Sequence, residues 1–333
     1  MESRREFLKT AATGALVLGS QSALGLVKVA DAHDAGKSRV VVARDANVHS
    51  SPGQPDEKRV AELLDKAVAS WTGREKPVEG WKRILGKDLG SDKVIGLKVN
   101  GLGGKGIATH AALTNAIAER LQQAGIKPGN IVIWEQRTNF LQACGFDHVD
   151  KPGQIRSLSS EIYGYEQTPV SFGTAKVKLA KALTLCDMVI GIPILKDHQI
   201  SGVTFAMKNM YGVVERPFEL HATGCNPGVA DLNCIPEIRQ KVRFTIGDAL
   251  SSVYEGGPSF HPERLWYPNA LIVGEDRVAI DHTAWQMIER KRAEVGMLTL
   301  EGAGRPPRYI ATAADAAHGL GVNDPQRIHL MEV

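Results

Sequence analysis

Polar residues with catalytic potential stand directly after the most apolar segment of the chain. The run DMVIGIPIL at 187–195 is followed at once by Lys196, Asp197 and His198. Burying such groups beside an apolar strand is costly unless they are paired or line a cleft. His198 is therefore a candidate proton carrier, because imidazole titrates near neutral pH, and Lys196 is a candidate catalytic partner. The alternative for His198 is a solvated histidine in a capped loop.

A second group of polar residues follows within a helix predicted over 202–211. Lys208 comes four positions after Thr204, so both side chains fall on one face of that helix. We expect Thr204 to contact a ligand held at the start of the helix. We expect Lys208 and its neighbour Asn209 to take part in the chemistry.

A glycine-rich loop after another strand has the composition of an anion-binding site. It runs from the strand predicted over 93–99 to a helix that opens near His110. Backbone N–H groups of such a loop, together with a helix N-terminus, suit a phosphate or carboxylate. His110 is a second candidate proton carrier. The candidate ligand-binding residues of this segment are Lys98, Asn100, Gly101, Gly103, Gly104, Gly106 and Thr109.

The glycines of this loop also fit a dinucleotide-binding pattern. Gly101, Gly103 and Gly106 satisfy G-x-G-x-x-G, and Glu135 ends the next strand, where a ribose-binding acid would lie. Lys98 interrupts the apolar strand end and the helix begins late, so dinucleotide binding is the weaker alternative. No Gly-Lys-Ser/Thr sequence occurs, which excludes a P-loop.

Three residues further along the chain are candidate metal ligands. Asp248 ends an apolar strand, Glu255 follows on a glycine-rich loop, and His221 precedes both. Carboxylate oxygens bind hard divalent cations, and either acid could instead act as a general base. Turn residues that cap backbone groups are the alternative. The sequence leaves the cofactor open, with a divalent metal as one option.

The cysteines are scattered, at Cys144, Cys186, Cys225 and Cys234. Because no C-x-x-C spacing occurs, we expect no iron–sulfur cluster to be ligated by this chain alone. Cys225 and Cys234 lie in a segment, 221–234, that is expected to be a loop. Its intervals fit no familiar zinc pattern, and buried thiols or one disulfide are the favoured alternatives.

The elements that must position these residues follow from hydrophobic periodicity. Strands are predicted over 38–43, 93–99, 130–134, 187–195, 242–246 and 270–273, and helices over 56–70, 109–124, 202–211 and 276–292. This order predicts an α/β fold with a mixed, mostly parallel sheet flanked by helices, in one body or in two lobes. The turn-rich segment 137–176 would be the lobe junction.

Parallel strands deliver their carboxyl ends to one edge of a sheet, where ligands of such folds bind. We therefore expect the polar residues of two distant segments to share one pocket. The residues expected to converge are Lys98, His110, Lys196, His198, Lys208 and Asn209.

The N-terminal segment predicts export. Arg4 and Arg5 precede an apolar run of small residues at 10–27 and an Ala-Asp-Ala sequence at 30–32. This is the pattern of a twin-arginine signal, and we expect cleavage after Ala32. The export machinery would then deliver residues 33–333 to the periplasm as a protein without membrane association. A retained N-terminal anchor is the alternative.

Composition narrows the classes of function. The chain has 333 residues, of which 43% are hydrophobic and 23% charged, so it can bury a full core. A net charge of +3, 6% aromatic residues and the lack of a basic run argue against a nucleic-acid partner. No later apolar run approaches the ~20 residues that a membrane span needs.

Taken together, these segments resemble the family known as domain of unknown function 362 (DUF362). The resemblance rests on ILKDHQISGVTFAMKNMYGVVE at 194–215, FTIGDALSSVYEGGP at 244–258 and GEDRVAID at 274–281. Asp197 stands where threonine is expected, and a ferredoxin-like module carried by some relatives is absent. The resemblance implies an α/β fold and a shared polar site, without a defined reaction.

The leading hypothesis is an exported enzyme that acts on a small anionic ligand. Lys98, Lys196 and Lys208 would bind the anion, and His198 or His110 would move a proton. A ligand-binding, metal-binding or maturation protein without turnover is the first alternative. A redox protein that uses Cys225 and Cys234 is the second.

Overall fold

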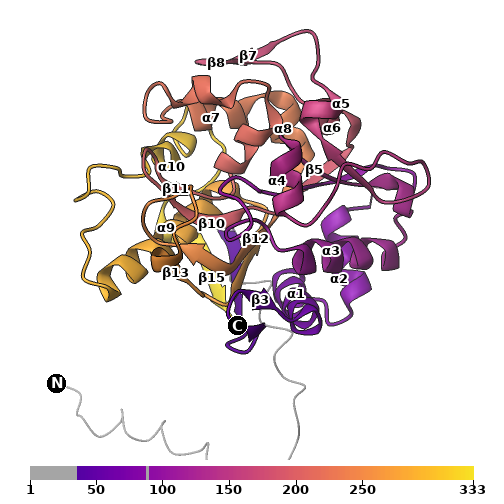
Figure 1. Ribbon diagram of the computed structural model, residues 1–333, viewed down its shortest axis with the longest axis horizontal. Helices are drawn as coiled ribbons and strands as arrows, with labels where there is room; N and C mark the ends of the chain where they lie inside the picture. Colours follow the sequence, from indigo (N-terminus) through magenta and orange to yellow (C-terminus); the bar gives the residue numbers. More distant parts are fainter. Residues whose placement is uncertain (1–35, 88–89) are drawn as a thin grey trace, which may run out of the picture. The chain divides into compact units, whose positions relative to one another are not determined.

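A mixed sheet of eleven strands runs through the part of the chain that the computed structural model describes, residues 36–87 and 90–333 (Figure 1). The signal peptide expected over 1–32 lies outside these residues. The main strand order is β15-β1-β14-β12-β9-β4-β5-β6. The strands are β1 (Ser38–Arg44), β4 (Ile95–Lys98), β5 (Ile131–Glu135), β6 (Arg156–Ser159), β9 (Met188–Gly191), β12 (Val242–Val253), β14 (Ala270–Gly274) and β15 (Ile328–Glu332).

The sheet has a parallel part and an antiparallel part. Strands β12, β9, β4, β5 and β6 run parallel to one another, whereas β14 is antiparallel to both β12 and β1. Strand β10 (Ile194–His198) pairs in parallel with β12 and antiparallel with β11 (Gly202–Thr204). On the other side of β12, β13 (Leu265–Trp266) adds a short antiparallel pair. The predicted mixed, mostly parallel sheet is therefore confirmed.

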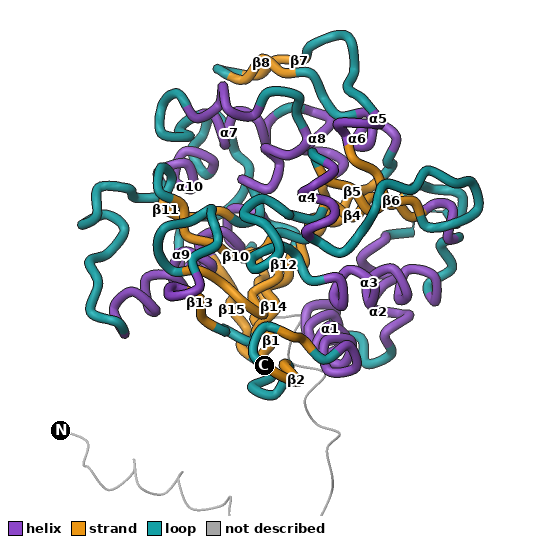
Figure 2. Tube along the Cα trace, viewed as in Figure 1, coloured by secondary structure: helices purple, strands orange, loops and turns teal. Residues whose placement is uncertain are grey.

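Helices cover both faces of the sheet because its strands alternate apolar side chains toward each face. In β5, Ile131 and Ile133 join a core with α1 (Glu57–Thr72), α2 (Pro77–Leu85) and α3 (Ala111–Gln123), and these three helices lie together in Figure 2. Val132 and Trp134 face the opposite core, which α6 (Lys181–Leu185), α7 (Gly228–Cys234), α8 (Pro236–Lys241) and α10 (Arg308–Ala313) cover. A third core lies under α9 (Arg277–Glu294).

The expected single strand over 187–195 is wrong. The structure divides it into β9 and β10 at Ile192-Pro193, where proline supplies no N–H to a ladder. Strand β9 pairs with β4, and β10 pairs with β12 and β11. Lys196, Asp197 and His198 consequently lie within β10 instead of following the strand.

The helix expected over 202–211 is also wrong. Gly202 adopts φ +73°, a conformation that favours glycine, and Val203 and Thr204 pair with β10 as strand β11. A 3-10 helix, η2 (Lys208–Val213), follows, and another, η3 (Pro217–His221), leads to α7. The segment 221–234, expected as a loop, therefore contains a helix.

Residues 137–176 do not form a lobe junction. They supply α4 (Thr138–Ala143), α5 (Ser160–Tyr163) and strand β6, which extends the main sheet beside β5. A hairpin, β7 (Val170–Phe172) with β8 (Ala175–Val177), follows, and β2 (His49–Ser51) with β3 (Gln54–Pro55) forms another. Residues 36–333 belong to one compact unit. None of the helices in the described ranges is long and apolar enough to span a membrane.

Candidate functional site

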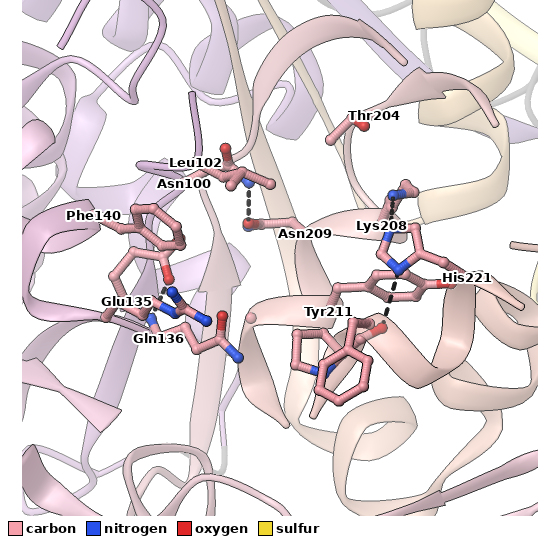
Figure 3. A pocket seen from close by; sticks show the side chains of 14 residues that line it. Asn100, Leu102, Glu135, Gln136, Phe140, Thr204, Lys208, Asn209, Tyr211 and His221 are labelled. Carbon is pink, nitrogen blue, oxygen red and sulfur yellow. Dashed lines mark hydrogen bonds between the residues drawn. The ribbon is translucent and has the colours of Figure 1, made fainter. Parts of the chain in front are cut away.

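A cavity of about 280 Å³ opens beside the carboxyl ends of β4 and β5 (Figure 3). Glu135, Gln136 and Phe140 form one side of it, and Lys208, Tyr211 and His221 form the other. Its remaining lining residues are Asn100, Leu102, Arg137, Thr204, Asn209, Gly212, Pro217 and Phe218. The segments 100–102, 135–140 and 204–221 therefore meet at the edge of the sheet where the strand order predicts a ligand site.

Lys98 does not reach this cavity as a free cation. Its side chain is fully buried, and its Nζ lies 3.2 Å from Glu135 Oε1. The same Nζ donates a 2.6 Å hydrogen bond to the carbonyl of Val99. Lys98 consequently neutralises the carboxylate of the cavity wall and is not available as the anion-binding group expected from the sequence.

The side-chain amine of Lys196 is likewise bonded to other groups inside the protein. Its Nζ is 2.7 Å from Asn100 Oδ1 and also donates to the carbonyls of Leu102 and Ile107. Burial lowers the pKa of Lys196 to about 7. Asn100 Nδ2 in turn donates to Asn209 Oδ1 at 3.1 Å. Lys196 thus holds the glycine-rich loop against β10, and of the residues in these contacts Asn100, Leu102 and Asn209 line the cavity, whereas Lys196 does not.

The glycine-rich loop packs against protein instead of forming an open anion cradle. A Cβ atom on Gly101, Gly103 or Gly106 would overlap another segment, and Gly104 has φ +86°. The N–H of Gly101 donates to Glu135 Oε1 at 3.2 Å, and that of Gly104 is bonded to the Gly101 carbonyl. Close packing and turn geometry therefore explain these glycines. The overlapped groups are the Phe140 carbonyl, the Pro258 carbonyl and the Phe260 ring.

Thr109 also serves the packing of this loop. Its Oγ1 donates to the carbonyl of Ile192 at 2.7 Å and accepts from the N–H of Asn100 at 2.8 Å. Thr204 differs, because its buried Oγ1 has no hydrogen-bond partner although the residue lines the cavity. An unpartnered buried hydroxyl at a cavity wall is available to a ligand.

Lys208 lies at the centre of the polar side of the cavity. Its Nζ is 2.9 Å from His198 Nε2 and 3.2 Å from His221 Nε2. Figure 3 shows the contact between Lys208 and His221. Strand β10 supplies His198, η2 supplies Lys208, and η3 supplies His221. The tertiary structure thus joins His198 and Lys208, expected together, with His221, which the sequence pattern grouped with the metal candidates.

Hydrogen bonds assign the tautomers of the two histidines. His221 Nδ1 faces the carbonyl of Pro217 at 3.1 Å, so Nδ1 carries a proton and Nε2 accepts from Lys208. His198 Nδ1 accepts from the N–H groups of residues 200 and 201, so neutral His198 carries its proton on Nε2, facing Lys208. A neutral Lys208 amine can accept from His198 and donate to His221 at the same time.

Electrostatics favour low charge in this cluster. Burial lowers the pKa of Lys208 to about 8. Burial, followed by the nearby charge of Lys208, lowers the pKa of His198 to about 2 and also lowers that of His221. The Tyr211 ring, 4.6 Å from Lys208 Nζ, favours the ammonium form, but burial outweighs it. Lys208 therefore exchanges its proton near pH 8.

His110 does not converge with this cluster, contrary to the sequence-based expectation. It lines a second cavity, of about 220 Å³, that has no lining residue in common with the first. His110 Nδ1 is 2.8 Å from Asp248 Oδ2, and this contact turns the ring toward β12. The register of β12, which sequence periodicity does not provide, places Asp248 beside His110.

The three candidate metal ligands do not meet. His221 contacts Lys208, Asp248 contacts His110, and Glu255 pairs with Arg292 and Arg305. Within residues 36–87 and 90–333, no group of three His, Cys, Asp or Glu side chains is arranged to hold a metal ion. The expectation that these three residues together bind a metal ion is therefore wrong. Glu255 is not free to bind a metal ion because its carboxylate is already paired with Arg292 and Arg305, which come from distant segments of the chain.

Arg305 also explains the burial of Asp197. Its guanidinium bonds Asp197 as well as Glu255, and Asp197 Oδ2 accepts from the N–H of Gly257 at 3.1 Å. Burial raises the pKa of Asp197 to about 6 against the opposing effect of Arg305. Asp197 thus holds the loop after β12 in place, and its burial does not indicate a catalytic role.

Cys225 and Cys234 are not joined in a disulfide, since both are free and buried. The Cys225 thiol lies beside Lys208. The Cys234 Sγ faces the carbonyl of His318 at 3.7 Å, and burial raises the pKa of this thiol. A redox function that requires this pair to bond directly is therefore not supported by the fold.

Sequence reasoning missed one wall of the cavity. Gln136, Arg137 and Phe140 were not singled out, and Glu135 was noted only as a candidate ribose-binding acid. These residues directly follow β5, a strand that was predicted nearly to its bounds. The rule that ligands bind at strand carboxyl ends would have found them if it had been applied to every strand.

The fold and the cavity define an α/β protein with a buried lysine between two histidines at the carboxyl edge of its sheet. The family model for "Domain of unknown function (DUF362)" matches residues 95–286. The chain belongs to this family, and the matched segment contains the cluster of His198, Lys208 and His221. The resemblance drawn from the sequence is thereby confirmed.

The solved structures to which this chain is similar are distant. A protein from Thermotoga maritima is 15% identical with a TM-score of 0.44, and 71% of this chain and 59% of that chain are covered. The lactate racemase apoprotein from Thermoanaerobacterium thermosaccharolyticum is 11% identical with a TM-score of 0.40, with 73% and 54% covered. This chain thus spans little more than half the length of either. A search of curated proteins found no match.

Proposed function

We propose that this protein is an enzyme that binds a small anionic ligand in the larger cavity and transfers a proton at it. The observation that carries the proposal is the position of Lys208 Nζ, 2.9 Å from His198 and 3.2 Å from His221 on the cavity wall. A lysine that exchanges its proton near pH 8 can serve as acid or base under ordinary conditions.

The charges of the cavity support an anionic ligand. Glu135 is the acidic residue of the lining, and its carboxylate is already paired with Lys98. Arg137 adds an exposed guanidinium, and Lys208 adds an ammonium when it is protonated. A carboxylate or phosphate would therefore meet positive charge, together with the unpartnered hydroxyl of Thr204.

The hydrogen-bond directions supply a path for the proton. The lone pair of a neutral Lys208 amine accepts from His198 Nε2–H in the resting site, and it can remove a proton from a bound ligand once that hydrogen bond is released. The resulting ammonium then donates to His221 Nε2, which is held as an acceptor by the Nδ1 contact with Pro217. An anionic ligand would favour the ammonium form of Lys208 and so stabilise the product of this proton transfer.

The test combines ligand binding with proton exchange. Small carboxylates and phosphates are screened by their effect on the melting temperature, and those that bind are incubated with the protein in D₂O. Nuclear magnetic resonance then measures deuterium incorporation at carbon next to the anionic group. We expect Lys208→Met to abolish incorporation, whereas Lys176→Met, at an exposed lysine on β8, should leave it unchanged.

Two outcomes separate the alternatives. A ligand that binds without exchange in any variant would identify a non-catalytic binding or maturation protein. Exchange that survives in Lys208→Met would refute the role of this amine. We also propose that the protein acts after export, because Arg4, Arg5 and the Ala-Asp-Ala sequence at 30–32 have the pattern of a twin-arginine signal.

A further inference from the structure

The second cavity of about 220 Å³ contains a serine, a histidine and an aspartate in contact order. His110 Nδ1 is 2.8 Å from Asp248 Oδ2, and His110 Nε2 is 3.4 Å from Ser251 Oγ. Both Ser251 and His110 line the cavity, whereas Asp248 is fully buried behind them. Neither Ser251 nor this arrangement has a part in the larger cavity.

Asp248 fixes the orientation of the His110 ring. Its Oδ2 also accepts from the backbone N–H of His110 at 2.9 Å, and its Oδ1 accepts from the N–H of Leu250 at 3.1 Å. Because a carboxylate accepts, His110 Nδ1 must carry the proton, and Nε2 is left to accept from the Ser251 hydroxyl. These are the roles that an orienting acid, a general base and a nucleophile need.

We propose that Ser251, His110 and Asp248 form a second catalytic site, which cleaves esters of short acyl groups. The 3.4 Å separation of Ser251 and His110 is within the looser range of such pairs before substrate binds. Ala108, Ala111 and Leu265 give the cavity small apolar walls, which suit a short acyl chain. Lys105 adds a positive charge at its rim.

The reaction balances with water as the only co-substrate. Ser251 Oγ bonds to the acyl carbon while its proton passes to His110 Nε2, and the tetrahedral intermediate then expels an alkoxide that takes this proton. Water repeats the sequence on the acyl-serine, releasing the carboxylic acid and restoring the serine. Asp248 holds the imidazolium that forms in each half and does not itself take the proton.

The start of helix α3 provides donors for the intermediate. Its first residue, Ala111, lines the cavity, and the first backbone bond of the helix runs from the N–H of Thr114 to the carbonyl of His110. The N–H groups ahead of that bond have no partner within the helix, and His110 makes no side-chain cap. Such groups stabilise developing negative charge.

The proposal predicts a rise of the reaction rate with pH. Burial alone would lower the pKa of His110, but the charge and hydrogen bond of Asp248 together raise it above its usual value. Only neutral His110 can accept the serine proton, so the reaction should accelerate as the pH passes upward through that pKa. His49, whose ring centre lies 6.5 Å away, has a lowered pKa, chiefly through burial, and adds no positive charge above it.

The test measures hydrolysis of p-nitrophenyl acetate and covalent labelling by methanesulfonyl fluoride, using the full protein. We expect mass spectrometry to place the label on Ser251. Ser251→Ala should lose label and hydrolysis, and His110→Ala should slow both by at least about 100-fold, with partial rescue by added imidazole. Ser252→Ala is the matched control, because Ser252 is an adjacent buried serine of β12 without a hydrogen-bond partner.

Melting temperatures of the variants distinguish loss of the site from loss of the fold. If Ser251→Ala is unfolded, Asp248→Asn and the labelling of the wild-type protein decide the question. A label on any other residue, or a labelling rate in His110→Ala equal to that of the wild type, would overturn the proposal. Loss of ester hydrolysis in Lys176→Met, at an exposed lysine of β8 that lines neither cavity, would also count against it.

Discussion

Replacing Lys208 by methionine should change how the stability of the folded protein depends on pH. Burial lowers the pKa of this amine from 10.5 to about 8 on folding. Between these values the unfolded chain holds a proton that the folded chain has released. Because the unfolded state binds more protons in this window, the free energy of unfolding rises with pH there.

The magnitude follows from the two pKa values. Each pKa unit corresponds to about 1.4 kcal/mol, so Lys208 contributes a rise of about 3 kcal/mol between pH 8 and 10.5. Below pH 8 the amine is protonated in both states and the contribution is constant. Lys196, whose pKa burial lowers to about 7, adds its own rise, which persists in the Lys208 variant.

The assay is urea unfolding at pH 8 and pH 10.5. The increase in unfolding free energy between the two conditions should be about 3 kcal/mol larger in the wild type than in Lys208→Met. Lys176→Met, at an exposed position, should behave as the wild type. Other groups that titrate in this range cancel in the comparison between variants.

An equal increase in the wild type and Lys208→Met would refute the reasoning. It would mean that the amine keeps its ordinary pKa in spite of its burial. An independent measurement is the rate at which acetic anhydride modifies the peptide containing Lys208, since only the neutral amine reacts. That rate should reach half its maximum near pH 8, and half-maximal reaction near pH 10.5 would contradict the prediction.

Three further predictions concern export and packing. Replacing Arg4 and Arg5 together by lysine should keep the protein out of the periplasm, and full delivery on cell fractionation would refute the routing. Gly101→Ala should lower the free energy of unfolding by about 1–3 kcal/mol, because the new Cβ overlaps the Phe140 carbonyl, and calorimetry measures this. Asp281→Asn should cost about 1–3 kcal/mol, because the buried carboxylate accepts from two backbone N–H groups just ahead of η2. An unchanged urea midpoint would contradict it.

Hydrophobic periodicity determined the α/β class and most of the elements. The runs around 38–44, 95–98, 131–135 and 270–274 became strands because alternating apolar residues can be buried on both faces of a sheet. The amphipathic stripe of α1 and the capping Asp276 of α9 were likewise local features. A long apolar run was insufficient at 187–195, since periodicity does not show that a proline ends one strand and begins another.

The sequence also indicated that polar residues gather at one edge of the sheet, because parallel strands deliver their carboxyl ends there. It placed His198 and Lys208 among the candidates, and the structure brings both together beside the larger cavity. It grouped Lys98 and Lys196 with them on residue type alone. Nothing in the local sequence distinguishes a lysine that faces a cavity from one whose side-chain amine is bonded to other buried groups of the protein.

Only the tertiary structure decided the role of each side chain, because the partners come from distant segments. Glu135 pairs with Lys98, and backbone carbonyls accept hydrogen bonds from Lys196. Lys208 is therefore the lysine that remains on the cavity wall. The register of β12 likewise sets Asp248 and Ser251 against His110, away from the first cavity. Charge and hydrogen-bond capacity belong to residue type, but whether they are satisfied depends on distances that the fold alone fixes.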